Sequence, residues 1–191
     1  MARRGASISR SAQALIVDEK EMGEHAVARS LTVELASAAD IPLIMAIERS
    51  PGYPALVGSY DADDHRRRME APTCDYLLCR SVGQLVGFAV IRRDEDGMGT
   101  AQLHRIAVSP PGQGYGSSFL EEICLWMFAK DDIQRLWLDV LPSNERAARV
   151  YRSMGFVREG VMRSALSVPG GRQDLVLMSL LREDWQQLCF R

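Results

Sequence analysis

The chain has 191 residues, of which 47% are hydrophobic, so it is long enough for one compact domain with a substantial core. Lysine and arginine number 23 against 25 acidic residues, and the resulting net charge of −2 excludes a broad positive surface for nucleic acid. No run of about 18 apolar residues occurs, so we expect no membrane span. The four cysteines lack the C-x2-C spacing of a zinc site, and we expect no metal and a reducing, cytoplasmic location.

The first 29 residues show little periodicity beyond one helical stretch around Asp18 to Arg29. They are basic and serine-rich, which is typical of a frayed extension or a weak organelle-transit segment. We therefore divide the chain into an N-terminal extension, residues 1–29, and one folded domain, residues 30–191.

Periodicity and helix caps define the first part of the domain. Leu31 to Leu35 alternates apolar and polar residues, as a half-buried strand does. Ser37 or Asp40 can cap a first helix. A second helix is expected over Asp61 to Glu70, whose acidic start and basic end complement the helix dipole, and its triplet Arg66 to Arg68 is typical of a solvated helix face.

Three antiparallel strands follow. The segments DYLLCRS and LVGFAVIRR are joined at Val82-Gly83-Gln84, a short hairpin connection, and an acidic turn leads into TAQLHRIAV. After the helix in SSFLEEICLWMFAK, the nearly continuously apolar RLWLDVL predicts a strand buried on both faces. A helix in PSNERAARVYRSMGF, capped at Ser143 or Asn144, precedes two strands joined at Pro169-Gly170-Gly171.

This order of elements predicts an α/β fold. We expect a mixed, mostly antiparallel sheet of about seven strands with helices on both faces. The strand-helix-strand crossover from Thr100 to Leu141 supplies one parallel pair.

The turn SPPGQGYG lies between the strand TAQLHRIAV and the next helix. Unpaired N–H groups at a helix start, with glycines that allow close approach, suit a phosphate or diphosphate. The turn is not the dinucleotide fingerprint, because G-x-G-x-x-G is not completed after Gly116, and no Gly-Lys-Ser/Thr follows as in a Walker loop. We expect a second helix beside it, with Asn144 and Tyr151 seven residues apart on one helical face.

Two segments in combination, LHRIAVSPPGQGYGSSFLEEI and RLWLDVLPSNERAARVYRSMGFVREG, resemble the GNAT superfamily of acyl-CoA-dependent N-acetyltransferases. The closing GGRQDLVLMSLLREDW is similar to the Rim-type protein N-terminal acetyltransferases, and the resemblance extends from Leu31 to Trp185. It implies transfer of an acetyl group from acetyl-CoA, a co-substrate, directly to an amine: a peptide N-terminus, an amino acid, a polyamine or another small amine. Cys124 lies mid-helix, a poor place for a nucleophile, which favours direct transfer. The implied partners are acetyl-CoA and the amine acceptor, with a homodimer left open.

The resemblance also implies a cofactor site built from backbone groups. Ile106, Ala107 and Val108 would line the pantetheine arm, because the family's strand splays from its parallel neighbour there and leaves the groups of Ile106 and Val108 unpaired. The Val108 N–H could also hold the thioester oxygen as negative charge develops. Asn144 matches the family asparagine that hydrogen-bonds the pantetheine. The diphosphate donors would be the N–H groups of the loop and helix start: Gly112, Gln113, Gly114, Tyr115, Gly116 and Ser117.

The loop departs from the family pattern Arg/Gln-x-x-Gly-x-Gly/Ala. If Gln113 takes the first position, the pattern ends in Ser118; if Gly116 is the final glycine, Pro111 stands where the family has arginine or glutamine. We prefer the second alignment, because it puts three apolar residues where the family's helix has its core residues: Phe119, Leu120 and Ile123. That alignment removes one donor side chain from the diphosphate site.

Four residues are candidates for proton transfer. Tyr151 matches the family tyrosine that protonates the departing thiolate; at pKa values near 10 and 8.5 it is a weaker acid than the thiol by only about 2 kcal/mol. Asp139 matches the position of the glutamate base in Rim-type enzymes, with a relaying water for the shorter side chain, or else it is an ion-pair partner of Arg105 or Arg163. The rival bases are His104, which is otherwise a packed histidine, and Glu48, which is otherwise a surface or acceptor-contact residue.

Two other functions are open at this point. The uncertain base and the missing loop arginine are compatible with a catalytically weak acyl-CoA-binding sensor or regulatory module. An antibiotic-modifying acetyltransferase would differ in its acceptor, with the acidic segment Asp61 to Asp64 attracting a polycation.

Overall fold

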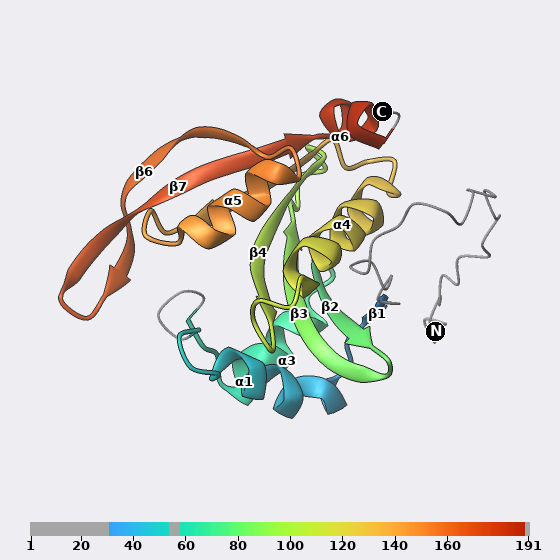
Figure 1. The fold of residues 1–191 in the computed structure, drawn as a ribbon, viewed down its shortest axis with the longest axis vertical. Coiled ribbons are helices and arrows are strands. Elements are labelled where there is room, and N and C mark those ends of the chain that lie inside the picture. Colours follow the sequence, from blue (N-terminus) through green and yellow to red (C-terminus); the bar gives the residue numbers. More distant parts are fainter. Residues whose placement is uncertain (1–30, 54–57, 190–191) are drawn as a thin grey trace, which may run out of the picture.

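A computed structural model describes residues 31–53 and 58–189, so the helical stretch expected around residues 18–29 lies outside the described part. The described residues form one seven-stranded sheet with helices on both faces, which confirms the predicted fold class (Figure 1). The strands are β1 (Leu31–Leu35), β2 (Cys74–Ser81), β3 (Gln84–Arg93), β4 (Thr100–Val108), β5 (Arg135–Val140), β6 (Val157–Val168) and β7 (Gly171–Leu181). The helices are a 3-10 turn (Ala38–Asp40), α1 (Ile41–Glu48), α3 (Ala62–Glu70), α4 (Tyr115–Phe128), α5 (Glu145–Ser153) and α6 (Arg182–Cys189).

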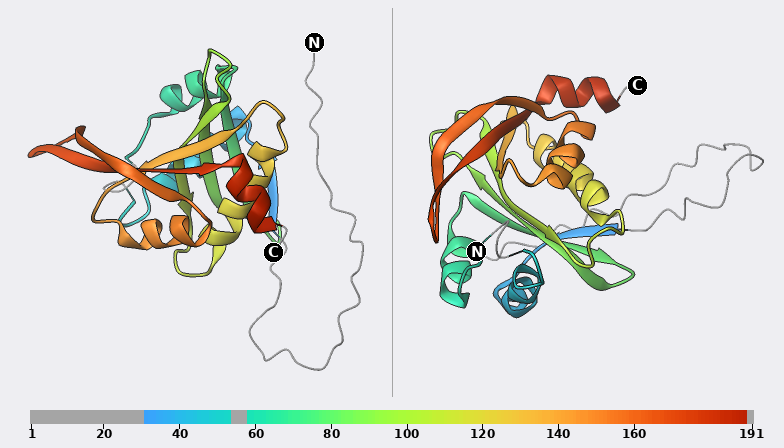
Figure 2. Two further views of the ribbon diagram at one scale, coloured as in Figure 1. Left: turned by 90° about the horizontal axis from the view of Figure 1, so that it is seen from above. Right: turned by 60° about the vertical axis from the view of Figure 1, so that its left-hand side comes forward.

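The sheet has the strand order β1-β2-β3-β4-β5-β7-β6. Neighbouring strands are antiparallel except β4 and β5, which α4 connects as the predicted crossover. Both predicted hairpin connections are present, at residues 82–83 and 169–170. The long β6–β7 hairpin projects beyond the rest of the sheet (Figures 1 and 2).

A β-bulge in β4 changes which side of the sheet its residues face. Val90 pairs with Arg105 and the next residue, Ile91, pairs with Leu103, so His104 is the extra residue of β4. Before the bulge, Leu103 packs in the core beneath α4. After it, Arg105 turns to the opposite side and contacts a side chain of α1.

β4 and β5 diverge soon after they begin. Their pairing is confined to residues 100–102 of β4 with 135–137 of β5. The Ser109 N–H donates to the Val86 carbonyl at 2.8 Å, one residue beyond the Gly87–Val108 pair. Because hydrogen bonds alternate along an antiparallel pair, the peptide groups of Val108 and Ile106 point away from β3. They therefore face the gap that opens between β4 and β5.

Helices cover both faces of the sheet (Figure 2), and each face carries its own cluster of buried apolar residues. Beneath α4 and α5, the fully buried Phe119, Leu120 and Ile123 lie at the helical positions that the preferred loop alignment requires. On the α1 and α3 side, Ile44 and Ile47 pack on alternate residues of β2 and β3. The gap between β4 and β5 is thus accessible to side chains from both layers.

Helix α6 follows β7 directly and was not among the predicted elements. The sequence pattern that indicates this helix is short: Glu183 and Asp184 lie in its first turn and Trp185 on its buried face. Trp185 stacks on Phe128 with ring centres 6.2 Å apart, which attaches α6 to the end of α4. None of the helices described is long and apolar enough to cross a membrane.

Candidate active site

Tyr151 and Asp139 lie on opposite faces of the sheet, close enough for the Asp139 charge to raise the pKa of Tyr151. Tyr151 is buried beneath α5, with its ring 5.8 Å from that of Phe156. On β5, Leu138 and Val140 are buried in the core beneath α4. Side chains alternate along a strand, so Asp139 between them faces the α1 and α3 side. The predicted acid and the predicted base therefore lie on opposite sides of the sheet at the gap.

Asp139 is not an ion-pair partner of Arg105 or Arg163 within the described residues. Its Oδ2 accepts a hydrogen bond of 2.9 Å from Gln102 Nε2, while Arg105 is paired elsewhere. Burial raises the pKa of Asp139 above its ordinary value, and the Gln102 hydrogen bond opposes this only in part. Asp139 is thus a stronger base than an exposed aspartate.

Its surroundings make the Tyr151 hydroxyl a weaker acid than the sequence argument required. Burial raises its pKa, and the negative charge of Asp139 raises it further. Proton transfer from Tyr151 to a thiolate is therefore uphill by more than the about 2 kcal/mol that ordinary pKa values give. The smaller of these two contributions to the pKa is removable, because the effect of Asp139 disappears when that carboxylate takes up a proton.

Val108 is already hydrogen-bonded on the side that faces the gap. Its N–H donates to the Tyr53 hydroxyl at 3.2 Å, and the same hydroxyl donates to the Val108 carbonyl. The prediction that the Val108 backbone groups are unpaired is therefore wrong, although their direction toward the gap is as predicted. Tyr53 lies outside the helices and strands predicted from the sequence, and no local pattern indicates a partner 55 residues away.

The loop before α4 has the backbone shape of a phosphate cradle. Gly112 and Gly114 have φ values of +88° and +80°, which favour glycine, and Gly114 is the N-cap of α4. The first helical hydrogen bond runs from the Ser118 N–H to the Gly114 carbonyl at 3.5 Å, so the N–H groups of Gly116 and Ser117 precede it. α4 has no acidic residue in its first turn, which leaves the positive end of its dipole for an anion.

Arg146 of α5 lies beside this loop. Its Nη2 is 4.0 Å from the position that a Cβ atom would take at Gly112. A cation from the neighbouring helix thus stands near the loop in which Pro111 replaces the family's arginine or glutamine. Sequence reasoning missed Arg146, although its position two residues after the α5 N-cap, Asn144, was a usable signal.

Asn144 caps α5, as predicted. Its Oδ1 accepts from the Ala147 N–H at 3.2 Å. The side-chain carbonyl is therefore engaged within the helix, and the amide NH2 is the group left to act as a donor toward a pantetheine arm.

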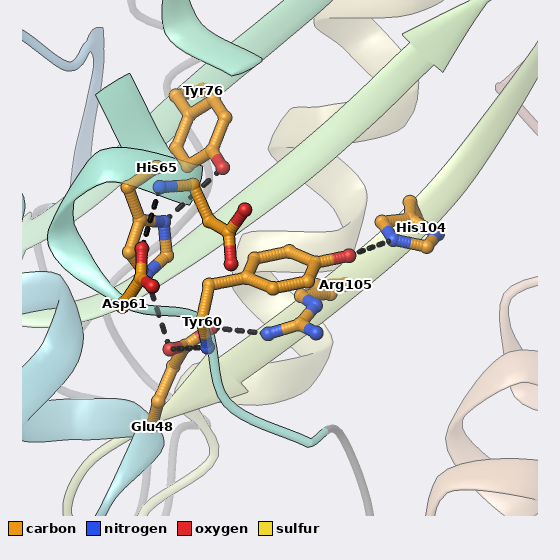
Figure 3. Close-up of polar contacts among 8 residues, drawn as sticks. Glu48, Tyr60, Asp61, His65, Tyr76, His104 and Arg105 are labelled. Carbon is orange, nitrogen blue, oxygen red and sulfur yellow. Dashed lines mark hydrogen bonds and ion pairs between the residues drawn. The ribbon is translucent and has the colours of Figure 1, made fainter. Parts of the chain in front are cut away.

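Glu48 lies at the centre of a buried polar network on the α1 and α3 side (Figure 3). It binds Arg105 Nη1 at 2.5 Å and His65 Nε2 at 3.1 Å, and accepts from the Tyr60 N–H at 3.2 Å. Burial alone would raise the pKa of Glu48, but these hydrogen bonds and the charge of Arg105 outweigh it and hold the pKa below its ordinary value. The Glu48 side chain is 0% exposed, so its placement at the surface is wrong, and it has no exposed oxygen with which to contact an amine.

His104, the bulge residue, is bound by Tyr60. The Tyr60 hydroxyl and His104 Nε2 are 2.8 Å apart, and the Tyr60 ring covers the Arg105 guanidinium at 3.4 Å from its centre (Figure 3). Burial, followed by the charges of Arg92, Arg105 and Arg68, lowers the pKa of His104 to about 4. His104 is therefore neutral at pH 7 and a much weaker base than its ordinary pKa suggested.

The acidic segment of α3 is internally compensated. Asp61 Oδ1 caps the helix by accepting from the Asp64 N–H at 2.7 Å. Asp63 pairs with Arg66 at 2.5 Å, and Asp64 pairs with Arg67. This segment does not present the concentrated negative charge that recruitment of a polycation requires.

Neither buried cysteine is suited to act as a nucleophile. Cys79 and Cys124 are fully buried, and burial raises the pKa of Cys79 to about 12 and that of Cys124 as well. This agrees with the mid-helix position of Cys124 predicted to be unsuitable for an acyl-enzyme.

The family model of the acetyltransferase (GNAT) family matches residues 43–156, which include the whole gap and the loop. The chain belongs to the GNAT acetyltransferase family. It is an acyltransferase of the GNAT type, as the sequence resemblance predicted.

Among GNAT relatives, the [ribosomal protein bS18]-alanine N-acetyltransferase of Escherichia coli (strain K12) is 28% identical over 152 residues, covering 78% of this chain and 96% of that protein. The N-alpha-acetyltransferase RimI of Mycobacterium tuberculosis is 35% identical over 111 residues, covering 54% of this chain and 65% of the relative. The solved spermidine N-acetyltransferase of Vibrio cholerae in complex with CoA and spermine has a TM-score of 0.73 at 17% identity, covering 82% and 98% of the two chains. The solved ribosomal-protein-S18-alanine N-acetyltransferase of Escherichia coli has a TM-score of 0.66 at 24% identity, covering 80% and 94%. At these identities the two structures support the fold.

Proposed function

We propose that this chain transfers an acetyl group from acetyl-CoA directly to a primary amine. The observation that carries the proposal is the gap between β4 and β5. The peptide groups of Ile106 and Val108 point into it, and in this proposal the Tyr151 hydroxyl and the Asp139 carboxylate act from its two sides. This arrangement suits a pantetheine arm laid along β4, with the thioester between an acid and a base.

The loop and its neighbours fit the remainder of acetyl-CoA. The helix start at Gly116 and Ser117 offers N–H donors to the diphosphate, and Arg146 offers the charge that Pro111 cannot. For the pantetheine to pair with Val108, the Tyr53 hydroxyl has to leave that residue.

Asp139 and Tyr151 act in sequence in this proposal. Asp139 takes a proton from the amine, directly or through a water, because an amine of pKa near 10.4 is almost entirely protonated at neutral pH. The amine nitrogen then forms the bond to the acetyl carbon as the carbon–sulfur bond breaks. Neutralised Asp139 no longer raises the pKa of Tyr151, so the Tyr151 O–H donates more readily to the departing thiolate.

Calorimetry with acetyl-CoA tests the binding half of the proposal, with binding near 1:1 expected. Failure to bind at millimolar acetyl-CoA would remove the basis of the proposal. Asp139→Asn and Tyr151→Phe test the chemical half, since both should lower kcat while leaving acetyl-CoA affinity nearly intact. Asp131→Asn, an exposed carboxylate change outside the gap, is the matched control.

A sensor that binds acyl-CoA without turnover is the second candidate, and the raised pKa of Tyr151 favours it. The discriminating measurement is CoA thiol release across a broad amine panel. Release no faster than hydrolysis with every amine, despite tight acetyl-CoA binding, would favour the sensor over the enzyme.

The relatives suggest two classes of acceptor for this chain. One is the amine of a protein, as in the ribosomal-protein alanine N-acetyltransferases and the N-alpha-acetyltransferase, and the other is spermidine. The charge around the gap bears on the choice between them.

A further inference from the structure

Two arginines lie close to residues that contact His104 and Asp139: Arg68 of α3 is over the Tyr60 ring, and Arg92 of β3 is paired with Gln102. The Arg68 Cζ atom is 4.1 Å from the centre of the Tyr60 ring, whose hydroxyl contacts His104. Arg92 is directly opposite Gln102 in the β3–β4 pair, so both side chains leave the same face of the sheet.

Gln102 connects Arg92 to the proposed base. Its Nε2 donates to Asp139 Oδ2 at 2.9 Å. Adjacent strands lie about 4.8 Å apart, so two spacings, about 10 Å, separate the backbone of Arg92 from that of Trp137, the β5 residue two positions before Asp139. A substrate with its amine at Asp139 therefore brings its next one or two residues within reach of the long arginine side chain.

Arg68 and Arg92 differ from the neighbouring arginines in their lack of a carboxylate partner. Within residues 31–53 and 58–189, neither has a carboxylate oxygen within 4.0 Å. The ion pairs on this side of the sheet use other arginines: Arg66 with Asp63, Arg67 with Asp64, Arg93 with Asp75, and Arg105 with Glu48. Both side chains line a hollow of about 350 Å³.

The local field is positive where an acceptor would lie. His104 shows it, because burial and then three arginine charges lower its pKa: Arg92, Arg105 and Arg68. Two carboxylates also border the hollow. Asp94 Oδ2 is held by the Thr100 N–H and Oγ1 at 2.9 and 3.0 Å, and Glu95 is exposed to solvent. The lining thus carries three arginines, Arg68, Arg92 and Arg93, against these two carboxylates, so a carboxylate would meet a small excess of opposite charge and a polyamine a small excess of like charge.

We propose that the hollow between Arg68 and Arg92 binds an acceptor carboxylate, so that the substrate is the N-terminal amine of a peptide with an acidic residue next in sequence. This rests on the proposed N-acetyltransferase function and names its substrate class. The separation of about 10 Å favours a side-chain carboxylate of the second residue over the α-carboxylate of a free amino acid.

Three amidated peptides that differ only at the second residue test the subsite: Ala-Glu-Ala-amide, Ala-Gln-Ala-amide and Ala-Lys-Ala-amide, with spermidine as the polyamine. The measurement is kcat/KM for CoA thiol release at low salt. We expect the glutamate peptide to exceed the glutamine peptide by about fivefold, and the lysine peptide and spermidine to be the poorest acceptors. The advantage should shrink in 0.5 M salt, since exposed charges are screened.

Arg92→Gln and Arg68→Gln should each remove most of the preference for glutamate, through KM more than kcat. Arg67→Gln is the matched control, because Arg67 lies on the same helix and is already paired with Asp64. A preference that persists in both subsite variants overturns the proposal. A higher kcat/KM with the lysine peptide or spermidine than with the glutamate peptide also overturns it. A preference for free alanine over alaninamide that exceeds the glutamate effect, or acetylation of none of the peptides, overturns it as well.

Acetyl-CoA calorimetry separates these failures from failure of the enzyme assignment. Loss of the peptide preference with intact acetyl-CoA binding and thiol release on some amine removes only the carboxylate subsite. Absence of acetyl-CoA binding removes the proposed function itself.

Discussion

Arg146→Gln should weaken acetyl-CoA binding by removing the cation beside the diphosphate loop. The Arg146 Nη2 atom lies 4.0 Å from the Cβ position of Gly112, and nothing in the loop itself carries positive charge. If the diphosphate oxygens lie about 4 Å from the guanidinium when bound, the two charges attract in water by about 1 kcal/mol. The site is exposed, so this value applies without enhancement from burial, and it corresponds to a dissociation constant about fivefold larger.

Isothermal titration calorimetry with two ligands isolates the phosphate contribution. Acetyl-CoA carries the diphosphate, whereas acetyl-pantetheine carries the same thioester and arm without it. The variant should bind acetyl-CoA about fivefold more weakly and acetyl-pantetheine unchanged, and the loss for acetyl-CoA should diminish as salt is added.

Arg149→Gln is the matched control for this prediction. Arg149 is on the same helix, is exposed, and pairs with Glu145 at 3.6 Å, so its removal should leave both affinities unchanged. Equal losses of acetyl-CoA affinity in the two arginine variants would show that the effect comes from net charge and not from the position of Arg146. An unchanged acetyl-CoA affinity in Arg146→Gln, or an equal loss of acetyl-pantetheine binding, would refute the assignment of Arg146 to the diphosphate.

Three further outcomes are expected. His104 should titrate near pH 4 in the folded protein, by NMR of its ring protons, and a midpoint near 6.5 would contradict its burial among arginines. Because the folded-state pKa is the lower one, the unfolded chain binds this proton first, and the free energy of unfolding should fall as pH drops from about 6.5 to 4. Glu48→Gln should lower the free energy of unfolding by about 3–5 kcal/mol, because it breaks a buried ion pair. The exposed Glu34→Gln should change it by less than about 1 kcal/mol. Similar losses for the two variants in denaturant titrations would be inconsistent with the network. Tyr53→Phe should tighten acetyl-CoA binding by up to about fivefold, since Val108 is then released from a competing hydrogen bond worth about 1 kcal/mol, and weaker binding would show that the hydroxyl assists the ligand instead.

Much of the fold follows from patterns of short range along the chain. Alternation in LTVEL, the turns at residues 82–83 and 169–170, and the cap at Asn144 each depend on a few neighbouring residues, and each appears as predicted. Helix α6 was missed because eight residues with one buried tryptophan give little periodicity, and its position depends on contact with Phe128.

The candidate site was less predictable because its polar contacts join distant parts of the chain. Glu48 and Arg105 are 57 residues apart, and Tyr53 and Val108 are 55 apart. A glutamate on a short helix resembles a surface residue until a cation from another strand is placed against it. Likewise, the pKa of Tyr151 depends on burial and on Asp139, neither of which the motif around Tyr151 contains.

The single extra residue in β4 has a consequence for how this strand tolerates change. Deleting His104 would remove the extra residue and keep Leu103 and Arg105 opposite Ile91 and Val90, on the faces that they already occupy, whereas inserting one residue directly after Arg105 would exchange the faces of everything downstream. After such an insertion Ala107 would turn toward α4, while Ile106 and Val108 would turn their side chains toward α1. The length of β4 beyond the bulge is therefore under tighter constraint than the presence of the bulged residue.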